Sequence, residues 1–339
     1  MRKPVVLITG AGGEIGHGLI ERLANRPTDR VVTLDVDPLD TGLAARVHRE
    51  FTGSILDGAL LDRVLAEFEV ELIFHLAALL STRSEFTPVT AHHVNVEGTL
   101  NLLEFAQRQC ESHGRSVVFL YPSSIAAYGL PDLDTKRASG RVSEDSWAFP
   151  LTMYGCNKLY CEQLGRYYAR HYKQLAARES INQVDFRSVR FPGLISAATV
   201  PSGGTSDYAP EMIHAAARGE PYECFVRPDT RIPFMAMPDA VDALVELASA
   251  PRNRLSRIAY NVGAFNPSAD EIRTLVLEAF PEAAIDYQVD EKRQRIVDSW
   301  PEDVETGPAM ADWGFAPRYD QQRAFAEYLI PNIRQRYGS

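Results

Sequence analysis

The sequence has few cysteines, no long apolar run and no excess of positive charge, and each absence excludes a class of protein. Its four cysteines form no C-x-x-C pair and suggest no zinc cage. We therefore expect reduced thiols and a cytoplasmic location. No apolar run reaches the roughly eighteen residues that a membrane span needs. The chain starts MRKP and enters an apolar stretch at once, so we expect no signal peptide.

Metal-binding and nucleic-acid-binding patterns are also missing. The eight histidines show no H-E-x-x-H or comparable ligand spacing, so no metal is expected. A formal charge of −10 argues against a surface for nucleic acid or for an anionic membrane. The 339 residues, 45% hydrophobic and 24% charged, suit a soluble protein with one large α/β core and a smaller lobe. Internal repeats and low-complexity segments are absent.

A glycine-rich turn near the start of the chain points to a dinucleotide site. An apolar strand over residues 5–9 is followed by glycines spaced G-x-x-G-x-x-G and by the start of a helix. Free N–H groups at the helix start, together with the positive end of its dipole, suit a pyrophosphate. The alternative is a structural strand–turn–helix. The residues of the predicted cradle are Gly10, Gly13, Glu14, Ile15 and Gly16.

A carboxylate at the end of the second predicted strand indicates which dinucleotide would bind. Asp35 lies near the end of the apolar stretch VVTLDV, residues 31–36, nineteen residues after Gly16. A carboxylate there can accept hydrogen bonds from a ribose diol, and it would repel a 2′-phosphate. NAD is therefore favoured over NADP.

Three further stretches are expected near the cofactor. Residues 51–57 predict a short strand ending in Asp57, which either accepts from the adenine amino group or caps the next helix, or does both. Residues 71–78 predict a strand whose small end residues let a flat cofactor lie against the backbone. Asn95 either bridges two backbone segments or supports the cofactor. The additional cofactor residues expected are Ile55, Leu56, Asp57, Leu76, Ala77, Ala78, Asn95, Ser123 and Phe191.

The order of the predicted elements indicates the fold class. Strand and helix alternate through the first 190 residues, which predicts a Rossmann-type, doubly wound parallel sheet. We expect residues 1–192 to form the NAD-binding domain. Residues 193–339 are expected to form mainly a smaller substrate-binding lobe, with some segments returning to the sheet. Between them, residues 130–147 turn polar and predict a surface loop or flap.

Tyr154 and Lys158 are the strongest candidates for chemistry. They are four residues apart on a predicted helix, so both side chains lie on one face. A free phenol, with a pKa near ~10, is a poor base, but a neighbouring ammonium and a bound nicotinamide cation both favour the phenolate. Ser123 and Ser124, after the preceding strand, can hydrogen-bond a substrate hydroxyl or a ketone oxyanion. An exposed pair without chemistry is the alternative, and the dinucleotide turn makes it the weaker one.

Together these motifs resemble the extended short-chain dehydrogenase/reductase superfamily over nearly the whole chain. Eight short stretches, in the same order along the chain, are similar to one branch, the NAD-dependent L-threonine 3-dehydrogenases of short-chain type. They are GAGGEIG, PSSIAAYG, TMYGCNK, RFPGLIS, PSGGTSDYAPEM, RIPFMAMPDAV, DSWP and DWG.

The resemblance implies a Rossmann fold, NAD as cofactor, a homodimer formed through helices that include the Tyr-Lys one, and oxidation of threonine to 2-amino-3-oxobutyrate. It implies that Tyr154 takes the hydroxyl proton while hydride passes to the nicotinamide ring. Lys158 would lower the phenol pKa and hold the ribose, and Ser124 would polarise the reacting oxygen, with Ser123 close enough to compete. The positions implied around the amino acid are Ser81, Ser124, Tyr154, Gly193, Thr205 and Trp300.

Two other functions stay open. A sugar-nucleotide epimerase or dehydratase, such as a UDP-sugar 4-epimerase, would need basic groups for a diphosphate, and Arg227, Arg231 and Arg293 could serve. A non-catalytic NAD sensor would not need the retained tyrosine, lysine and serine.

The chain departs from the threonine branch in two places. Residues 131–147 and 173–182 are longer than this branch generally carries. If the first segment lies beside the active site, it closes over the substrate or alters its identity. Threonine and a related small hydroxy compound therefore both stay open as substrates.

Overall fold

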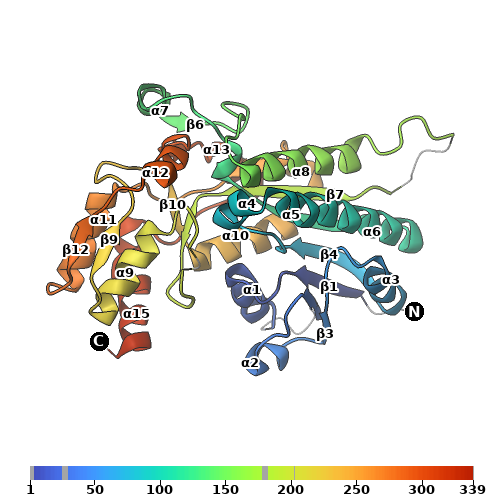
Figure 1. The fold of residues 1–339 in the computed structure, drawn as a ribbon. Helices are drawn as coiled ribbons and strands as arrows, with labels where there is room; N and C mark the ends of the chain where they lie inside the picture. The colour runs from blue at the N-terminus through green and yellow to red at the C-terminus, as the bar shows by residue number, and fades with distance from the viewer. Residues whose placement is uncertain (1–3, 25–29, 178–181, 202, 339) are drawn as a thin grey trace.

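The computed structural model describes residues 4–24, 30–177, 182–201 and 203–338, and a seven-stranded sheet forms its centre (Figure 1). Every pairing in this sheet is parallel, in the order β11-β7-β5-β4-β1-β2-β3. This is the predicted doubly wound Rossmann-type fold, with the strand order reversing between β1 and β4. The strands are β1 (Pro4–Thr9), β2 (Val31–Asp35), β3 (Arg49–Thr52), β4 (Glu69–His75), β5 (Val118–Ser124), β7 (Asp185–Phe191) and β11 (Ala259–Asn261).

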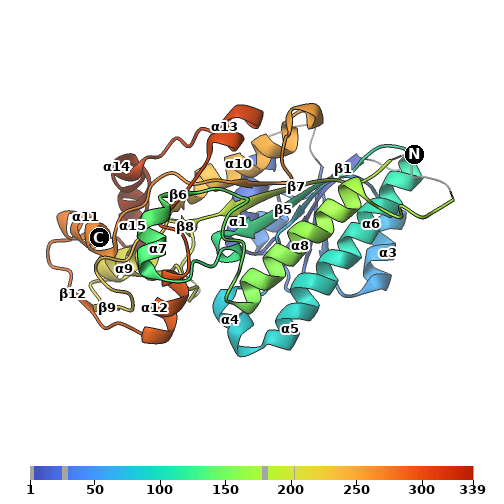
Figure 2. The ribbon, with the colours of Figure 1, turned by 90° about the horizontal axis from the view of Figure 1, so that it is seen from above.

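Helices bury both faces of the sheet, as a parallel sheet requires. Val6 and Ile8 of β1 belong to the apolar cluster under α1 (Glu14–Ala24) and α10 (Met237–Ser249), whereas Val5 and Leu7 belong to the opposite cluster. The opposite face carries α3 (Gly58–Glu67), α6 (Gly98–His113) and α8 (Met153–Arg170), which lie side by side in Figure 2. The shorter helices of this half are α2 (Thr41–Ala44), α4 (Ser81–Phe86), α5 (Pro88–His92), the π-helix η1 (His93–Glu97) and the 3₁₀-helix η2 (Ile125–Ala127).

The chain after residue 192 forms a second apolar core and also contributes to the large sheet. Tyr208, Met212 and Phe234 are fully buried in this second core, at the yellow-to-red end of Figure 1. β11 and α10 return to the seven-stranded sheet; the domain division at residue 192 stays a prediction. The remaining elements are β8 (Gly193–Ile195), α9 (Tyr208–Arg218), β9 (Tyr222–Cys224), β10 (Phe234–Ala236), η3 (Arg252–Arg254), α11 (Ala269–Ala279), β12 (Ile285–Tyr287), α12 (Glu291–Asp298), β13 (Asp303–Val304), α13 (Gly307–Trp313), α14 (Gln321–Arg323), η4 (Ala324–Leu329) and α15 (Ile330–Tyr337).

The polar stretch predicted as a surface loop or flap lies largely at the surface, but it is a packed segment with a helix and a strand of its own. It contains α7 (Leu133–Ser139) and β6 (Arg141–Val142), and β6 pairs with β13. Lys136 and Val142 are each 2% exposed. The prediction as a loop was wrong because the apolar and aliphatic groups of this short stretch are buried by segments far away in sequence. The other longer connection, residues 173–182, lies partly outside the described residues.

One predicted strand ends earlier than expected. β3 stops at Thr52, and Gly53 then turns the chain with a φ of +154°, a conformation that favours glycine. The predicted strand over residues 51–57 is therefore mostly a turn. In the described part of the chain no helix is both long and apolar enough to span a bilayer, and the cytoplasmic location stays a prediction.

Candidate active site

A cleft of about 990 Å³ lies at the carboxyl edge of the sheet, between its strand ends and the second lobe. In an open α/β sheet ligands bind at this edge, near the point where the strand order reverses. The predicted cofactor residues that line the cleft are Gly10, Gly13, Glu14, Ile15, Gly16, Asp35, Ile55, Leu76, Ala77, Ala78, Ser123, Tyr154, Lys158 and Phe191. The predicted substrate residues that line it are Ser81, Ser124, Tyr154, Gly193 and Trp300.

At two positions of the glycine turn, any side chain larger than a hydrogen atom would collide with neighbouring backbone. Gly10 has a φ of +68°, and a Cβ there would lie 2.5 Å from the backbone nitrogen of Ala77 at the end of β4. A Cβ at Gly16 would lie 2.3 Å from the carbonyl oxygen of Ala11, so the helix packs directly on the turn. At Gly13 the nearest atom would be 3.4 Å away, which leaves this part of the turn open. The turn therefore fits a pyrophosphate approaching the N-terminus of α1.

The carboxylate of Asp35 is fixed beside this turn. Its Oδ2 accepts from the Gly12 N–H at 2.8 Å, and its Oδ1 accepts from the Asp37 N–H at 3.3 Å. Both Gly12 and Asp35 line the cleft. A negative charge is thus held where the second strand ends, within reach of a ligand that occupies the glycine turn.

Tyr154 and Lys158 lie in the first turns of α8, whose start is fixed by Thr152. The Thr152 hydroxyl accepts from the Gly155 N–H at 3.0 Å, as an N-cap does. The Lys158 side chain is buried, and its Nζ donates to the carbonyl of Pro122 at 2.6 Å. This ammonium lies 4.6 Å from the ring centroid of Tyr121 and 5.3 Å from that of Tyr154.

Burial shifts the pKa values of both groups toward their neutral forms. Burial lowers the pKa of Lys158 to about 8, against the opposing effects of Cys161 and Glu162. Burial also raises the pKa of Tyr154 above its ordinary value. In the protein without a cofactor, desolvation of the phenolate therefore dominates the pKa of Tyr154, and the predicted joint effect of the ammonium and a bound nicotinamide cation stays a prediction.

The two serines at the end of β5 have different partners. Ser123 is buried, and its hydroxyl donates to the carboxylate of Glu162, which also accepts from Arg190 Nε at 2.9 Å and Nη2 at 2.7 Å. Ser124 begins η2, where its Oγ accepts from the Ala126 N–H at 3.1 Å. Ser124 thus keeps its own hydroxyl proton for an acceptor in the cleft, whereas the proton of Ser123 is used by Glu162.

Ser81 joins the two halves of the cleft. Its Oγ accepts from the backbone N–H of Thr205 at 3.3 Å and from the Thr205 hydroxyl at 3.2 Å. The neighbouring Thr82 hydroxyl donates to the Gly203 carbonyl at 2.7 Å. Thr205 is 3% exposed and does not line the cleft among the described residues; it contacts Ser81, and its contact with a substrate stays a prediction.

Three predicted cofactor residues lie outside the cleft lining as the structure describes it. Asp57 caps α3 by accepting from the N–H groups of Ala59 and Leu60 at 3.0 and 3.1 Å, and Leu56 is exposed. Asn95 bridges the backbone of Leu79, accepting from its N–H at 2.7 Å and donating to its carbonyl at 3.1 Å. The structure thus shows the predicted helix cap at Asp57 and the predicted backbone bridge at Asn95.

The cleft also contains residues that sequence reasoning missed. Gly53 and Ser54 line it in place of the predicted Asp57, because β3 ends earlier than expected. Placing the end of this strand at the glycine would have found them. Thr199, Asp207 and Arg336 reach the cleft from the second lobe. Asp207 lies in the stretch PSGGTSDYAPEM, which could have indicated it, whereas no local pattern indicates Thr199 or Arg336.

Glu14, the first residue of α1, faces these second-lobe residues. Burial raises its pKa to about 7, and the negative charge of Asp207 adds to this rise, while a hydrogen bond with Thr199 opposes it. This carboxyl group is therefore expected to change its protonation state near neutral pH.

The three arginines considered for a diphosphate do not line the cleft in the described part of the chain. Arg231 forms two hydrogen bonds to Glu271, at 2.6 and 2.9 Å. Arg227 forms two to Asp298, at 2.8 and 3.0 Å. Arg293 donates to the Gly204 carbonyl at 2.8 Å and stacks on Phe225.

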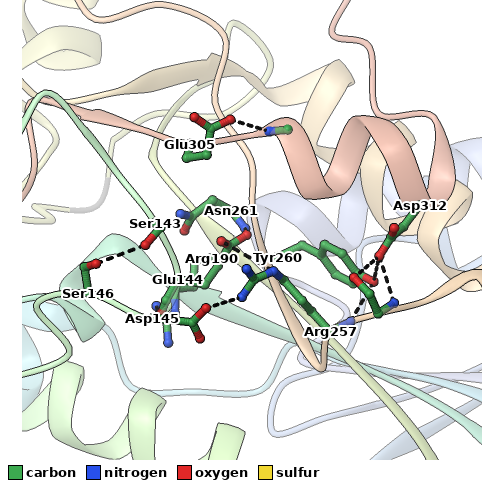
Figure 3. Close-up of polar contacts among 12 residues, drawn as sticks. Ser143, Glu144, Asp145, Ser146, Arg190, Arg257, Tyr260, Asn261, Glu305 and Asp312 are labelled. Carbon is green, nitrogen blue, oxygen red and sulfur yellow. Dashed lines mark hydrogen bonds and ion pairs between the residues drawn. The ribbon is translucent and has the colours of Figure 1, made fainter.

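Residues 131–147 also stay out of the described cleft lining, so they form no cover over it. Figure 3 shows how the second half of this segment is held against the sheet instead. Arg190 of β7 donates to the Glu144 carbonyl at 2.9 Å, and Arg257 pairs with Asp145 at 2.6 Å. The Asn261 N–H of β11 donates to the Glu144 carboxylate at 2.9 Å.

Residues 6–263 match the model of the NAD dependent epimerase/dehydratase family. The chain belongs to this family. This agrees with the resemblance to extended short-chain dehydrogenases/reductases that the motifs indicate. An uncharacterized epimerase/dehydratase from Staphylococcus saprophyticus is 34% identical, with 93% of this chain and 92% of the relative covered.

Solved structures with the same fold over the full length include L-threonine dehydrogenases. A monomeric L-threonine 3-dehydrogenase from a metagenome, in its apo form, has a TM-score of 0.86 and 32% identity, covering 98% of this chain and 100% of the other. A GalE-like L-threonine dehydrogenase from Cupriavidus necator, in its holo form, has a TM-score of 0.84 and 35% identity, covering 97% and 100%.

Proposed function

We propose that this family member is an NAD-dependent dehydrogenase that oxidises the β-hydroxyl of L-threonine to 2-amino-3-oxobutyrate. The observation that carries the proposal is that one cleft brings together the glycine turn, Asp35, and the side chains of Ser124, Tyr154 and Lys158. The names of the structural neighbours, at 32% and 35% identity, favour threonine among the small hydroxy amino acids.

NAD would be held by the first half of the chain. The N–H groups of the turn from Gly10 to Gly16 would bind its pyrophosphate, and Asp35 would accept from the adenosine ribose diol. The backbone at Ala77, which Gly10 approaches closely, would face the cofactor across the sheet edge. When bound, NAD supplies the acceptor for the hydride that leaves the β-carbon of the substrate.

The proton of the substrate hydroxyl would pass to the phenolate oxygen of Tyr154. Ser124 would donate its free hydroxyl proton to the reacting oxygen as this atom becomes a carbonyl oxygen. The charge of Lys158, 5.3 Å from the Tyr154 ring, favours the phenolate and opposes the effect of burial. Lys158 would also donate to the nicotinamide ribose with its other N–H groups.

The substrate end of the cleft would be formed by Ser81, Gly193 and Trp300. The Ser81 hydroxyl, oriented by Thr205, can hydrogen-bond the carboxylate or the ammonium group of threonine. Trp300 would wall off the small methyl group. A Cβ at Gly193 would lie 2.6 Å from the ring of Phe234, so the position needs glycine. Its bare backbone borders the cleft.

A sugar-nucleotide epimerase or dehydratase is the second candidate. It is kept because Arg83 and Arg336 line the cleft and could approach a diphosphate. Against it, Arg227, Arg231 and Arg293 are all engaged elsewhere, and Arg336 donates to the Ala198 carbonyl at 2.7 Å.

Absorbance of NADH tests the first proposal. Purified protein mixed with NAD and L-threonine should produce NADH, whereas L-serine or L-allo-threonine should give a slower rate. A UDP-sugar should give neither NADH nor an epimerised product. Turnover of a UDP-sugar without any NADH from threonine would replace the first candidate by the second.

We further propose a homodimer formed through the helix layer that contains α8. Large apolar side chains are exposed there on contacting helices: Phe86 is 82% exposed, Val89 69% and Tyr160 55%. Exposed apolar side chains gathered on neighbouring helices are typical of interaction sites. Light scattering after size-exclusion chromatography should give twice the chain mass, and Val89→Asp should reduce it to that of one chain. A single-chain mass for the unchanged protein would contradict the proposal.

A further inference from the structure

The packed segment that follows Leu130 runs along the end of α12, outside the cleft. The Leu130 N–H donates to the Ser299 carbonyl at 2.8 Å, and the Glu305 N–H donates to the Val142 carbonyl at 2.9 Å. β6 pairs with β13 between these two points. The first half of the segment therefore contacts the stretch of residues 297–305 at several points, and this stretch carries Trp300.

Lys136 makes the central contact. Its side chain is buried, and its Nζ donates to the carbonyl of Val297 at 3.1 Å. The same carbonyl accepts from the Trp300 N–H, also at 3.1 Å. Val297 lies in the last turn of α12, where carbonyls lack helical partners and the helix dipole favours a cation. The Val297 carbonyl thus accepts both from the Lys136 ammonium and from the backbone of Trp300, whose indole lines the cleft.

We propose that Lys136 is a positioning residue for Trp300, and that this packed segment acts on the substrate end of the cleft from behind. The inference rests on the proposed function only in taking Trp300 as a substrate contact. Trp300 is 4% exposed and Val297 is fully buried. A shift of the turn from Val297 to Trp300 therefore moves a packed indole.

The charges around Lys136 explain why it contacts a backbone carbonyl. Asp298 accepts from both terminal nitrogens of Arg227 and from Gln294 Nε2 at 2.7 Å, so three donors of other side chains already surround its carboxylate. Asp298 and Glu302 favour the ammonium by their charge, and Arg227 disfavours it. Removing the amine would take from the Val297 carbonyl its only side-chain donor among the described contacts, and would remove this cross-segment contact from the turn.

Steady-state kinetics of Lys136→Met test the inference. We expect a KM for threonine about tenfold higher, the scale of one lost hydrogen bond from a charged donor, with kcat and the Kd of NADH changed less than about twofold. Lys292→Met removes an exposed lysine from the same helix, α12, and should leave all three values unchanged. If the variant Trp300→Phe raises the KM for threonine but the variant Lys136→Met leaves it unchanged, the inference is overturned.

A second measurement does not depend on the substrate. Labelling with 5-fluorotryptophan gives one ¹⁹F resonance for each of the three tryptophans, assigned by single Trp→Phe variants. In Lys136→Met the Trp300 resonance should shift while that of Trp313, in the other apolar core, stays in place. An unmoved Trp300 resonance would overturn the inference even if threonine proved not to be the substrate. If Lys136→Met fails to fold, Lys136→Gln replaces it in both measurements, and the same two outcomes decide.

Discussion

The Lys158 ammonium lies 5.3 Å from the centre of the Tyr154 ring, yet it donates to the Pro122 carbonyl and not to the phenol. Its influence on the phenol is therefore a matter of charge, and this influence is strongest when water is excluded from the cleft. Because burial alone raises the pKa of Tyr154, a dehydrogenase built on this pair needs both the lysine charge and the bound cofactor cation.

Replacing Tyr154 by Phe should remove the proton acceptor and preserve the cleft. We expect turnover of threonine to fall by roughly 10²–10⁴-fold, the usual contribution of a positioned acid or base. The Kd of NADH, measured by fluorescence, should stay within about twofold. Turnover close to that of the unchanged protein would dismiss the assigned role.

Asp35→Ala should weaken the preference for NAD over NADP. The carboxylate would repel a 2′-phosphate, and alanine would not. The ratio of kcat/KM for the two cofactors measures the effect. Asp37→Ala, which removes an exposed carboxylate two residues later, is the matched control and should leave this ratio unchanged. An unaltered preference in Asp35→Ala would mean that Asp35 does not contact the ribose.

NAD binding should depend on pH through Glu14. Its pKa of about 7 means that the carboxyl group is largely protonated below pH 7 and charged above it. A pyrophosphate at the N-terminus of α1 would disfavour the charged form, so NADH should bind more tightly one unit below pH 7 than one unit above. Calorimetry at both values should show this difference in the unchanged protein and little of it in Glu14→Gln. The same dependence in both proteins would exclude Glu14 as its source.

Stability should fall in acid because of His75. The ring is buried, with its Nδ1 2.8 Å from the Thr9 hydroxyl and its Nε2 2.9 Å from the Thr99 hydroxyl. Burial lowers its pKa from the ordinary 6.5 to about 3, with the Lys158 charge adding to this effect.

Between pH 6.5 and pH 3 the unfolded chain binds this proton and the folded one does not, so stability is lost as pH falls through that range. The slope attributable to one such group is at most about 1.4 kcal/mol per pH unit. Urea unfolding of His75→Gln should show a shallower loss on acidification, despite lower stability at pH 7. His92→Gln, at an exposed position, should follow the unchanged protein.

Patterns within short stretches were enough to predict the sheet, the glycine turn and the helix that carries Tyr154 and Lys158. Alternation of apolar strands and helices dictates a parallel sheet because each buried strand must be followed by a helix that covers it. Asp35 was found because the carboxyl end of a strand is visible as the end of an apolar run. The same rule misplaced the end of the next strand, which lies at Thr52 and not at Asp57, while the predicted capping of a helix by Asp57 is observed.

Contacts between distant segments decided the rest. The diphosphate candidates Arg227 and Arg231 turned out to be paired with acids 71 and 40 residues away in sequence. The Lys136 side chain is buried where its ammonium contacts the Val297 carbonyl at the end of α12, 161 residues away in sequence. Spacing in the sequence determines which side chains share a helix face or a strand end, whereas the partner of a buried charge depends on which surfaces the folded chain brings together, because desolvation makes an unpaired charge costly wherever it is buried.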